Sequence, residues 1–249
     1  MSLLKVQNLK KYYPIYHGVF RRISGWVKAV DDVSFEMGSN EILGVVGESG
    51  SGKTTLGRCL VNLVKPTSGT IELSGAVQMI FQDPGGALNP RHTIGETLRE
   101  PLLYHRLVSS PKEADLIAID WLKKIGLDAS IMRRFPHEFS LGQKQRLAIA
   151  RSLLLKPKLL ICDEPVSALD VSVQAQILNL FLDLHETLNM SLLFISHDLG
   201  VVRFLAKRTL VMYRGQVVES GLTEELFKNP RHPYTQRLLA SSPGKFQKK

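Results

Sequence analysis

The chain has 249 residues, 44% of them apolar, and its 32 lysines and arginines outnumber its 23 acids. This length allows one large domain or two lobes. No apolar run approaches the roughly 18–20 residues that a membrane-spanning helix needs, and charges interrupt the start, so we expect neither a spanning helix nor a secretory signal. Two cysteines cannot build a disulfide framework or a zinc site. The expectation is a soluble, intracellular protein.

The net charge of +9 is concentrated at the two ends of the chain. Residues 1–30 and residues 226–249 each carry six basic side chains and no acid, whereas the middle of the chain is slightly acidic. Nucleic-acid binders usually carry basic side chains as a stripe on one working face, so we expect no nucleic-acid partner. The basic ends fit an anionic membrane surface, an acidic partner or plain solvation, and these alternatives stay open.

In the first part of the chain, short apolar segments alternate with helical patterns. Residues 42–46 and 77–81 are continuous apolar runs, as expected for strands buried on both faces, and a helix is expected over 54–64. Between 82 and 150 the pattern turns helical and polar, with helices expected over 93–106, 111–125 and 141–155. We therefore predict a helical lobe at about 82–150.

The strand pattern returns after the helical lobe. Apolar runs at 159–162 and 192–195 predict two more buried strands, and residues 173–188 predict a helix between them. From Thr209 the sequence pattern predicts a β-hairpin that turns at Arg214-Gly215. Alternating strands and helices predict a parallel α/β sheet, so residues 1–81 and 151–249 would form an α/β core lobe within a single domain.

A glycine-rich loop follows the first predicted strand. Residues 47–54, Gly-Glu-Ser-Gly-Ser-Gly-Lys-Thr, fit the pattern G-x-x-x-x-G-K-[ST] between a strand and a helix. Glycines let backbone N–H groups point at phosphate oxygens, and the helix N-terminus adds its positive dipole end. We expect Lys53 to reach the β- and γ-phosphates and Thr54 to bind Mg²⁺ through its hydroxyl. A dinucleotide site is disfavoured, because the third glycine is missing and Lys53 intrudes.

Two further motifs carry chemistry. Asp163 and Glu164 end a predicted buried strand, where Asp163 can bind a metal and Glu164 can orient or deprotonate a water. Strand-end acids are often structural, but together with the phosphate loop they predict a hydrolytic site. Ser140 and Gln143 fit a capping box at the start of a helix, and Gly142 between them permits close approach of a second anion.

These motifs, in this order, resemble the ATP-binding subunit of ABC transporters over nearly the whole chain, from about Leu3 to Ser242. The resemblance implies an α/β fold, namely a P-loop NTPase core of ABC type with an inserted helical subdomain and a small N-terminal antiparallel β region. It implies Mg²⁺-dependent hydrolysis of ATP, in which Glu164, His197 and Lys53 are catalytic. It also implies that Gln82 contacts Mg²⁺ and that Tyr13, unless its neighbour Tyr12 is meant, stacks on adenine.

The resemblance implies a complete set of ligand-binding residues. Mg²⁺ would be held by Thr54, Gln82 and Asp163. The residues implied to bind ATP are Tyr13, Gly47, Glu48, Ser49, Gly50, Ser51, Gly52, Lys53, Thr54, Thr55, Gln82, Ser140, Gly142, Gln143 and Asp170.

A narrower resemblance links the chain to the dipeptide/oligopeptide/nickel permease group. The segments that carry it are residues 81–84 and 88–91, residues 164–176, and Arg231-His-Pro-Tyr-Thr235. In that group a second ATP-binding subunit, identical or paralogous, completes a head-to-tail dimer at the cytoplasmic face of the membrane, beneath two integral-membrane permease subunits. An extracytoplasmic binding protein delivers peptides, nickel or other metal chelates, or glutathione. The alternative is a soluble ABC ATPase subunit of an enzyme complex, such as a carbon–phosphorus lyase accessory protein, which has a similar tail.

One departure from the family pattern affects the predicted activity. Leu141 replaces the first glycine of the usual Leu-Ser-Gly-Gly-Gln signature, whereas Ser140 and Gly142 remain. We expect reduced rather than abolished activity at the site that this signature completes. The altered signature also favours, weakly, a paralogue over an identical chain as the partner.

Overall fold

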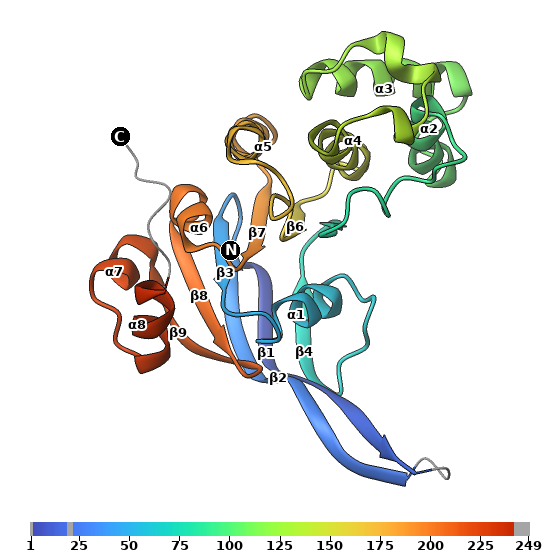
Figure 1. Ribbon diagram of the computed structural model, residues 1–249. Helices are drawn as coiled ribbons and strands as arrows, with labels where there is room; N and C mark the ends of the chain where they lie inside the picture. The colour runs from blue at the N-terminus through green and yellow to red at the C-terminus, as the bar shows by residue number, and fades with distance from the viewer. Residues whose placement is uncertain (1, 19–21, 242–249) are drawn as a thin grey trace. The chain divides into compact units, whose positions relative to one another are not determined.

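The computed structural model describes residues 2–18 and 22–241. By its internal contacts the chain forms two compact units (Figure 1). The first unit combines Met1–Gly75 with Met190–Lys249, and the second is Ala76–Asn189. The predicted lobe boundaries at residues 82 and 150 do not coincide with this division, and they stay a prediction.

The first unit contains an antiparallel sheet with the strand order β2-β1-β4. Its strands are β1 (Ser2–His17), β2 (Arg22–Gly38) and β4 (Ser68–Leu73). β1 and β2 form a long hairpin, drawn in blue in Figure 1. The large apolar side chains exposed on the described part of its outer half include Ile15, Tyr16, Ile23, Trp26 and Val27. The predicted N-terminal antiparallel region is therefore present.

The first unit also contains a largely parallel sheet that carries the phosphate loop. Within this unit β3 (Ile42–Val46) lies between β7 (Ser191–Ser196) and β8 (Arg208–Tyr213) and runs parallel to both. β9 (Gln216–Leu222) returns antiparallel to β8 as a hairpin, as the sequence predicts. Every residue of β3 and β7 is buried, which explains their continuous apolar sequences.

Among its described residues, the first unit also has four short helices. They are α1 (Lys53–Leu60), α6 (Leu199–Leu205), α7 (Thr223–Lys228) and α8 (Pro233–Ala240). α6 packs on β3 and β7, and α7 packs on β8 and β9. α1 ends at Leu60 instead of residue 64, because Asn62 adopts a left-handed conformation with φ of 58°. Both cysteines of the chain, Cys59 in α1 and Cys162, are free and buried.

The second unit is mostly helical. β5 (Val77–Ile80) and β6 (Leu159–Asp163) form a parallel pair. The helices are α2 (Ile94–Tyr104), α3 (Pro111–Lys124), α4 (Leu141–Leu153) and α5 (Val171–Leu188), with 3₁₀ turns η1 (Ala129–Arg133) and η2 (Pro136–Glu138). α2 packs on α3, and α4 packs on α2, α3, α5 and β5. In the described part of the chain, no helix has the length and apolar character required to cross a membrane.

Candidate functional site

The loop between β3 and α1 has a backbone that only glycine can follow at two points. Gly47 has φ of 154°, and a Cβ there would lie 2.2 Å from the carbonyl oxygen of Met212. Gly52 has φ of 106°, and a Cβ there would lie 2.1 Å from the carbonyl oxygen of Ala29. Any side chain at these positions would therefore displace backbone of the neighbouring strands. The two glycines of the motif are required by packing as well as by the expected phosphate.

The side chain of Lys53, the first residue of α1, extends back into this loop. Its Nζ donates hydrogen bonds to the carbonyl oxygens of Gly47 at 2.7 Å and Glu48 at 2.9 Å, and the residue is only 4% exposed. A buried ammonium group at the N-terminus of a helix concentrates positive potential in the loop. This arrangement fits an anionic ligand such as a polyphosphate. Thr54 and Thr55 follow in the first turn of α1, where both are half-buried.

Two segments distant in sequence hold the loop at its ends. The backbone N–H of Glu48 donates to the hydroxyl oxygen of Tyr234 at 2.9 Å. The N–H of Gly215, in the turn between β8 and β9, donates to the carbonyl oxygen of Ser51 at 2.9 Å. Sequence analysis placed Gly215 in a hairpin turn but predicted no role for Gly215 or Tyr234 at the phosphate loop. The only signal for Tyr234 was its place in the His-Pro-Tyr-Thr segment.

His197 emerges beside the phosphate loop. Val46 and Ser196 are paired in the parallel ladder of β3 and β7, so the residues that follow them, Gly47 and His197, leave the same edge of the sheet. Ligands of α/β proteins bind at this carboxyl edge. The next residue, Asp198, accepts hydrogen bonds from the N–H groups of Gly200 at 2.8 Å and Val201 at 3.3 Å, and thereby fixes the start of α6. The side chain of His197 is exposed at this edge.

The structure distinguishes the two candidate tyrosines in β1. Tyr12 donates its hydroxyl hydrogen to Oδ1 of Asp31, and this bond raises the pKa of Tyr12 and lowers the pKa of Asp31. Tyr13 is 38% exposed, and the Nζ of Lys11 lies 4.9 Å from its ring centroid. The engaged hydroxyl makes Tyr12 a structural residue. Tyr13 offers the exposed ring that base stacking requires.

In the second unit, the parallel pair of β5 and β6 brings Gln82 and Glu164 together. Ile80 pairs with Cys162, so the residues after both strands leave one edge. Nε2 of Gln82 donates to Oε2 of Glu164 at 3.2 Å. Asp163 ends the buried strand and is 3% exposed. Gln82, implied by the family resemblance, and Glu164, predicted for the hydrolytic site, are therefore in direct contact.

Glu164 is held in a strained backbone conformation. Its φ is 48°, in the left-handed region that residues with a Cβ rarely adopt, at a typical cost of about 1–3 kcal/mol. Its carbonyl oxygen accepts hydrogen bonds from the N–H of Ser167 at 3.3 Å and from the hydroxyl of Ser167 at 3.0 Å. This turn fixes the direction in which the chain leaves β6. Strain of this kind is typical of a functional position.

The signature segment forms the predicted capping box at the start of α4. The hydroxyl oxygen of Ser140 accepts from the N–H of Gln143 at 3.3 Å, and Oε1 of Gln143 accepts from the N–H of Ser140 at 3.0 Å. Leu141, which replaces the usual glycine, is 38% exposed. A Cβ on Gly142 would lie 2.6 Å from Cγ1 of Val173 in α5. Gly142 is therefore required for helix packing, which sequence analysis had not anticipated.

Asp170 has a clear structural role at the start of α5. Its carboxylate accepts hydrogen bonds from the N–H of Val173 at 3.0 Å and from the hydroxyl of Ser172 at 2.9 Å. These bonds lower the pKa of Asp170. The residue thus caps the helix. Its contact with nucleotide stays a prediction.

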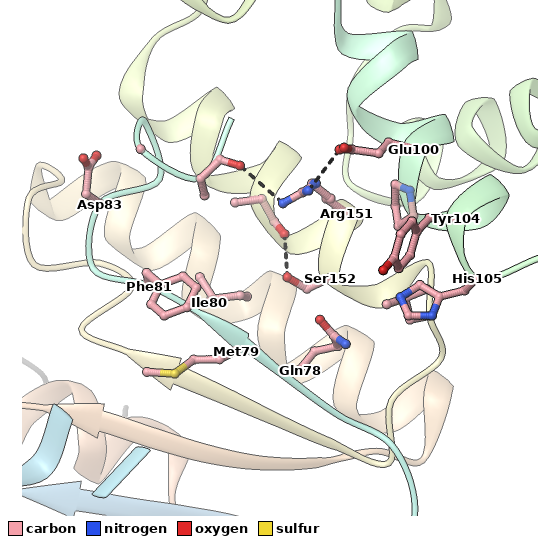
Figure 2. Close-up of a pocket in the computed structure, with 15 residues that line it drawn as sticks. Gln78, Met79, Ile80, Phe81, Asp83, Glu100, Tyr104, His105, Arg151 and Ser152 are labelled. Carbon is pink, nitrogen blue, oxygen red and sulfur yellow. Dashed lines mark hydrogen bonds and ion pairs between the residues drawn. The ribbon is translucent and has the colours of Figure 1, made fainter. Parts of the chain in front are cut away.

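The second unit also holds a cavity of about 740 Å³ (Figure 2). β5, the segment after it, α2 and α4 contribute its walls. Arg151 crosses the cavity, donating to Oε2 of Glu100 at 3.2 Å and to the carbonyl oxygen of Ala87 at 3.3 Å. Tyr104 is 80% exposed where α2 ends. The cavity includes Phe81, the residue before Gln82.

Without a bound nucleotide, the described residues supply only part of the oxygen atoms that a metal ion such as Mg²⁺ requires. Outside the residues that the structure leaves undescribed, no three histidine, cysteine or acidic side chains come together as a metal cluster. Mg²⁺ is normally bound by one or two protein oxygens and by substrate phosphates. One buried strand-end carboxylate, Asp163, and one helix-start hydroxyl, Thr54, are donors of this kind.

Comparison with known proteins identifies the family. Residues 30–167, more than half of the chain, match the family model for ABC transporters. The chain belongs to the ABC transporter family. Residues 218–248 of this ABC protein match a second model, the C-terminal region of oligopeptide/dipeptide transporters.

The ABC protein is similar in sequence to two named ATP-binding proteins. The oligopeptide transport ATP-binding protein AppF of Bacillus subtilis is 47% identical over 259 residues, which cover 97% of this chain and 78% of the relative. The dipeptide transport ATP-binding protein DppF of Escherichia coli is 46% identical over 257 residues, which cover 97% of this chain and 76% of the relative.

Solved structures confirm the predicted fold. CbiO1 from Clostridium perfringens, part of the ABC transporter complex CbiONQ, aligns with a TM-score of 0.78 and 25% identity, over 92% of this chain and 91% of that one. The ATP-binding cassette MJ0796, a dimer in a post-hydrolysis state with ADP and phosphate, aligns with a TM-score of 0.77 and 27% identity, over 88% and 98%. This protein is therefore an ABC-type ATPase.

Proposed function

We propose that this chain is the ATP-binding and ATP-hydrolysing subunit of an ABC importer for peptides. Two relatives at 46–47% identity are named for oligopeptide and dipeptide transport. The match to the C-terminal region of oligopeptide/dipeptide transporters, at residues 218–248, carries the proposal, since that region lies outside the general ABC match. Nickel or another metal chelate is the less supported cargo. The enzyme-complex alternative has only the shared His-Pro-Tyr-Thr tail in its favour.

Each predicted site residue receives a role in this proposal. The adenine ring stacks on Tyr13, and the phosphates lie in the loop of residues 47–55, where Lys53 neutralises their charge. Glu164, held by Gln82, accepts the proton of the attacking water. His197 contacts the γ-phosphate. Two observations support these assignments. The ammonium group of Lys53 is buried in a glycine-rich loop. The backbone of Glu164 is strained, and its carboxylate accepts a hydrogen bond from the side-chain amide of Gln82.

Thr54, Gln82 and Asp163 are proposed to hold Mg²⁺. When bound, Mg²⁺ would neutralise charge on the phosphates. Asp163 contributes a carboxylate that is 3% exposed at the end of a buried strand. The hydroxyl of Thr54 lies in the first turn of α1.

The protein is proposed to act as a head-to-tail dimer with a second ATP-binding subunit, identical or paralogous. Ser140, Gly142, Gln143 and Asp170 then face the nucleotide held by the partner. Since the capping box already orders Ser140 and Gln143, this surface needs little rearrangement on dimerisation. Loss of the γ-phosphate on hydrolysis would remove charge from between the subunits and open the dimer.

Two permease subunits are proposed to bind at the cytoplasmic face of the membrane, against the helical segment of residues 82–106. The cavity in Figure 2 supports this proposal, because it joins the strand before Gln82 to α2 and leaves Tyr104 exposed at its edge. A cytoplasmic segment of a permease can insert there. The extracytoplasmic binding protein would deliver cargo on the other side of the membrane.

The deciding experiment is affinity isolation of the tagged full chain from detergent-solubilised membranes of its native cell. We expect two polytopic permeases and a second ATP-binding subunit to be retained. A Lys53→Ala variant should retain the same partners but lose ATP affinity. Recovery of the tagged chain only from the soluble fraction, bound to metabolic enzymes, would refute the proposal of an importer. Unchanged ATP binding by Lys53→Ala would refute the assignment of the phosphate loop.

A further inference from the structure

We propose that Tyr234 is a positioning residue for the nucleotide site, through which the C-terminal segment holds the phosphate loop ready for ATP. The inference rests on the proposed ATP-binding function and adds a residue to it. Tyr234 lies in α8, and the loop lies between β3 and α1, both in the first unit. The contact joins residues 186 positions apart in the sequence.

The tyrosine ring is fixed by burial and stacking. Tyr234 is 2% exposed, and its ring stacks on Tyr213 of β8 with centroids 4.1 Å apart and an interplanar angle of 29°. Burial raises the pKa of Tyr234, so the phenol is neutral at physiological pH. A neutral hydroxyl in a fixed ring can accept a backbone hydrogen bond in only a narrow range of positions. The N–H of Glu48 occupies one of them, at 2.9 Å.

The start of α8 is itself tied to the sheet. The carboxylate of Glu219 in β9 accepts hydrogen bonds from the N–H groups of Arg231 at 2.9 Å and His232 at 3.0 Å. Nδ1 of His232 accepts from the N–H of Tyr234 at 3.1 Å. Burial of Glu219 raises its pKa, but the hydrogen bonds it accepts outweigh this and lower the pKa overall. The backbone that carries Tyr234 is therefore held independently of the loop.

One residue of the loop connects this anchor to the lysine. The N–H of Glu48 is bonded to Tyr234, while its carbonyl oxygen accepts from Nζ of Lys53 at 2.9 Å and from the N–H of Ser51 at 3.2 Å. Without the tyrosine hydroxyl, the first turn of the loop would gain alternative conformations. ATP would then have to order the loop as it binds. The apparent affinity for ATP would fall in proportion to the fraction of chains whose loop already has the binding conformation.

Tyr234→Phe tests this proposal because it removes the hydroxyl and keeps the stacked ring. Tyr213→Phe is the matched control, since it removes a hydroxyl from the same stacked pair without touching Glu48. In the full chain we expect Tyr234→Phe to raise the Kd for Mg·ATP about three- to tenfold, the range for one lost hydrogen bond, with less than twofold change in the control. Hydrogen exchange at the Glu48 amide should accelerate, whereas the Leu56 amide, bonded to Gly52 O, should keep its protection.

A second variant keeps the test decisive if Tyr234→Phe folds poorly. Glu219→Ala loosens the start of α8 without altering the tyrosine or the loop. By itself, Glu219→Ala should raise the Kd for Mg·ATP and accelerate hydrogen exchange at the Glu48 amide. Where Tyr234→Phe folds, the losses of the two variants should not add in a double-mutant cycle. Additive losses, or wild-type affinity and amide protection in both variants, would overturn the inference. A wild-type chain that does not bind ATP would instead refute the proposed function.

Discussion

Gly142→Ala is the substitution whose effect the structure defines most directly. The new Cβ would lie 2.6 Å from Cγ1 of Val173, well inside van der Waals contact, and valine in a helix has essentially one rotamer and cannot turn away. Alanine gains up to about 1 kcal/mol of helix propensity over glycine. Overpacking costs about 1–3 kcal/mol. Because the cost of overpacking exceeds the gain in helix propensity over most of its range, we expect a net destabilisation of up to about 2 kcal/mol, measured by urea unfolding.

Val173→Ala provides the control for this prediction. It removes Cγ1, so the clash disappears and only the propensity gain is left. Gly142→Ala should therefore be neutral or stabilising in the Val173→Ala background, which reverses the sign of its effect. The reasoning is refuted if Gly142→Ala destabilises both backgrounds equally. The ATPase activity of the double variant in the proposed complex gives a second test, since recovered stability with lost activity would indicate a further role of Gly142 at the nucleotide of the proposed partner subunit.

Three further predictions concern single residues. Glu164→Gln should still bind ATP but hydrolyse it about 10²–10⁴ times more slowly, as expected for loss of a general base, and near-normal steady-state turnover would contradict that role. Tyr13→Ala should raise the Kd for ATP about tenfold, the value of one stacking interaction, whereas Tyr12→Phe should change it less than twofold; a fluorescence titration in which Tyr12→Phe is the weaker binder would reverse the assignment. Because folding lowers the pKa of Asp170, its carboxylate stabilises the fold at pH values above its ordinary pKa of 3.8, and this stabilisation is lost as the pH falls through the folded-state pKa. The difference in thermal stability between wild type and Asp170→Asn should therefore shrink between pH 6 and pH 3. An advantage that does not change with pH would show that the charge of Asp170 is irrelevant to the cap.

Local patterns in the sequence predicted much of the fold. Both ends of β3 were predicted at the residues where the structure has them, because a continuous apolar run between a polar turn and a glycine loop allows the strand to begin and end in only one place. The capping box of Ser140 and Gln143 was predicted because it depends on four consecutive residues. The turn at Arg214-Gly215 followed from local signals in the same way.

Features that depend on distant contacts were not predictable. The N-terminal antiparallel region was expected only from the family resemblance, and local patterns did not locate β1 and β2, because their pairing contains several register shifts that break the alternation typical of a strand. The bond from Glu48 to Tyr234 and the contact of Gly142 with Val173 join residues that no spacing rule connects. The left-handed conformation of Glu164 was also invisible, because the residue type gives no hint of a positive φ.

The burial of both native cysteines makes this protein a ready subject for fluorescent labelling. Burial and the adjacent Asp163 raise the pKa of Cys162 well above its usual range, and burial likewise raises that of Cys59, partly opposed by Lys11. Thiols that stay protonated and shielded react slowly with maleimides. A cysteine introduced at an exposed position, such as Leu141 or Tyr104, would therefore carry a dye selectively in the otherwise unaltered chain. Motions of the signature helix and of the surface beside the cavity can then be followed separately in single molecules.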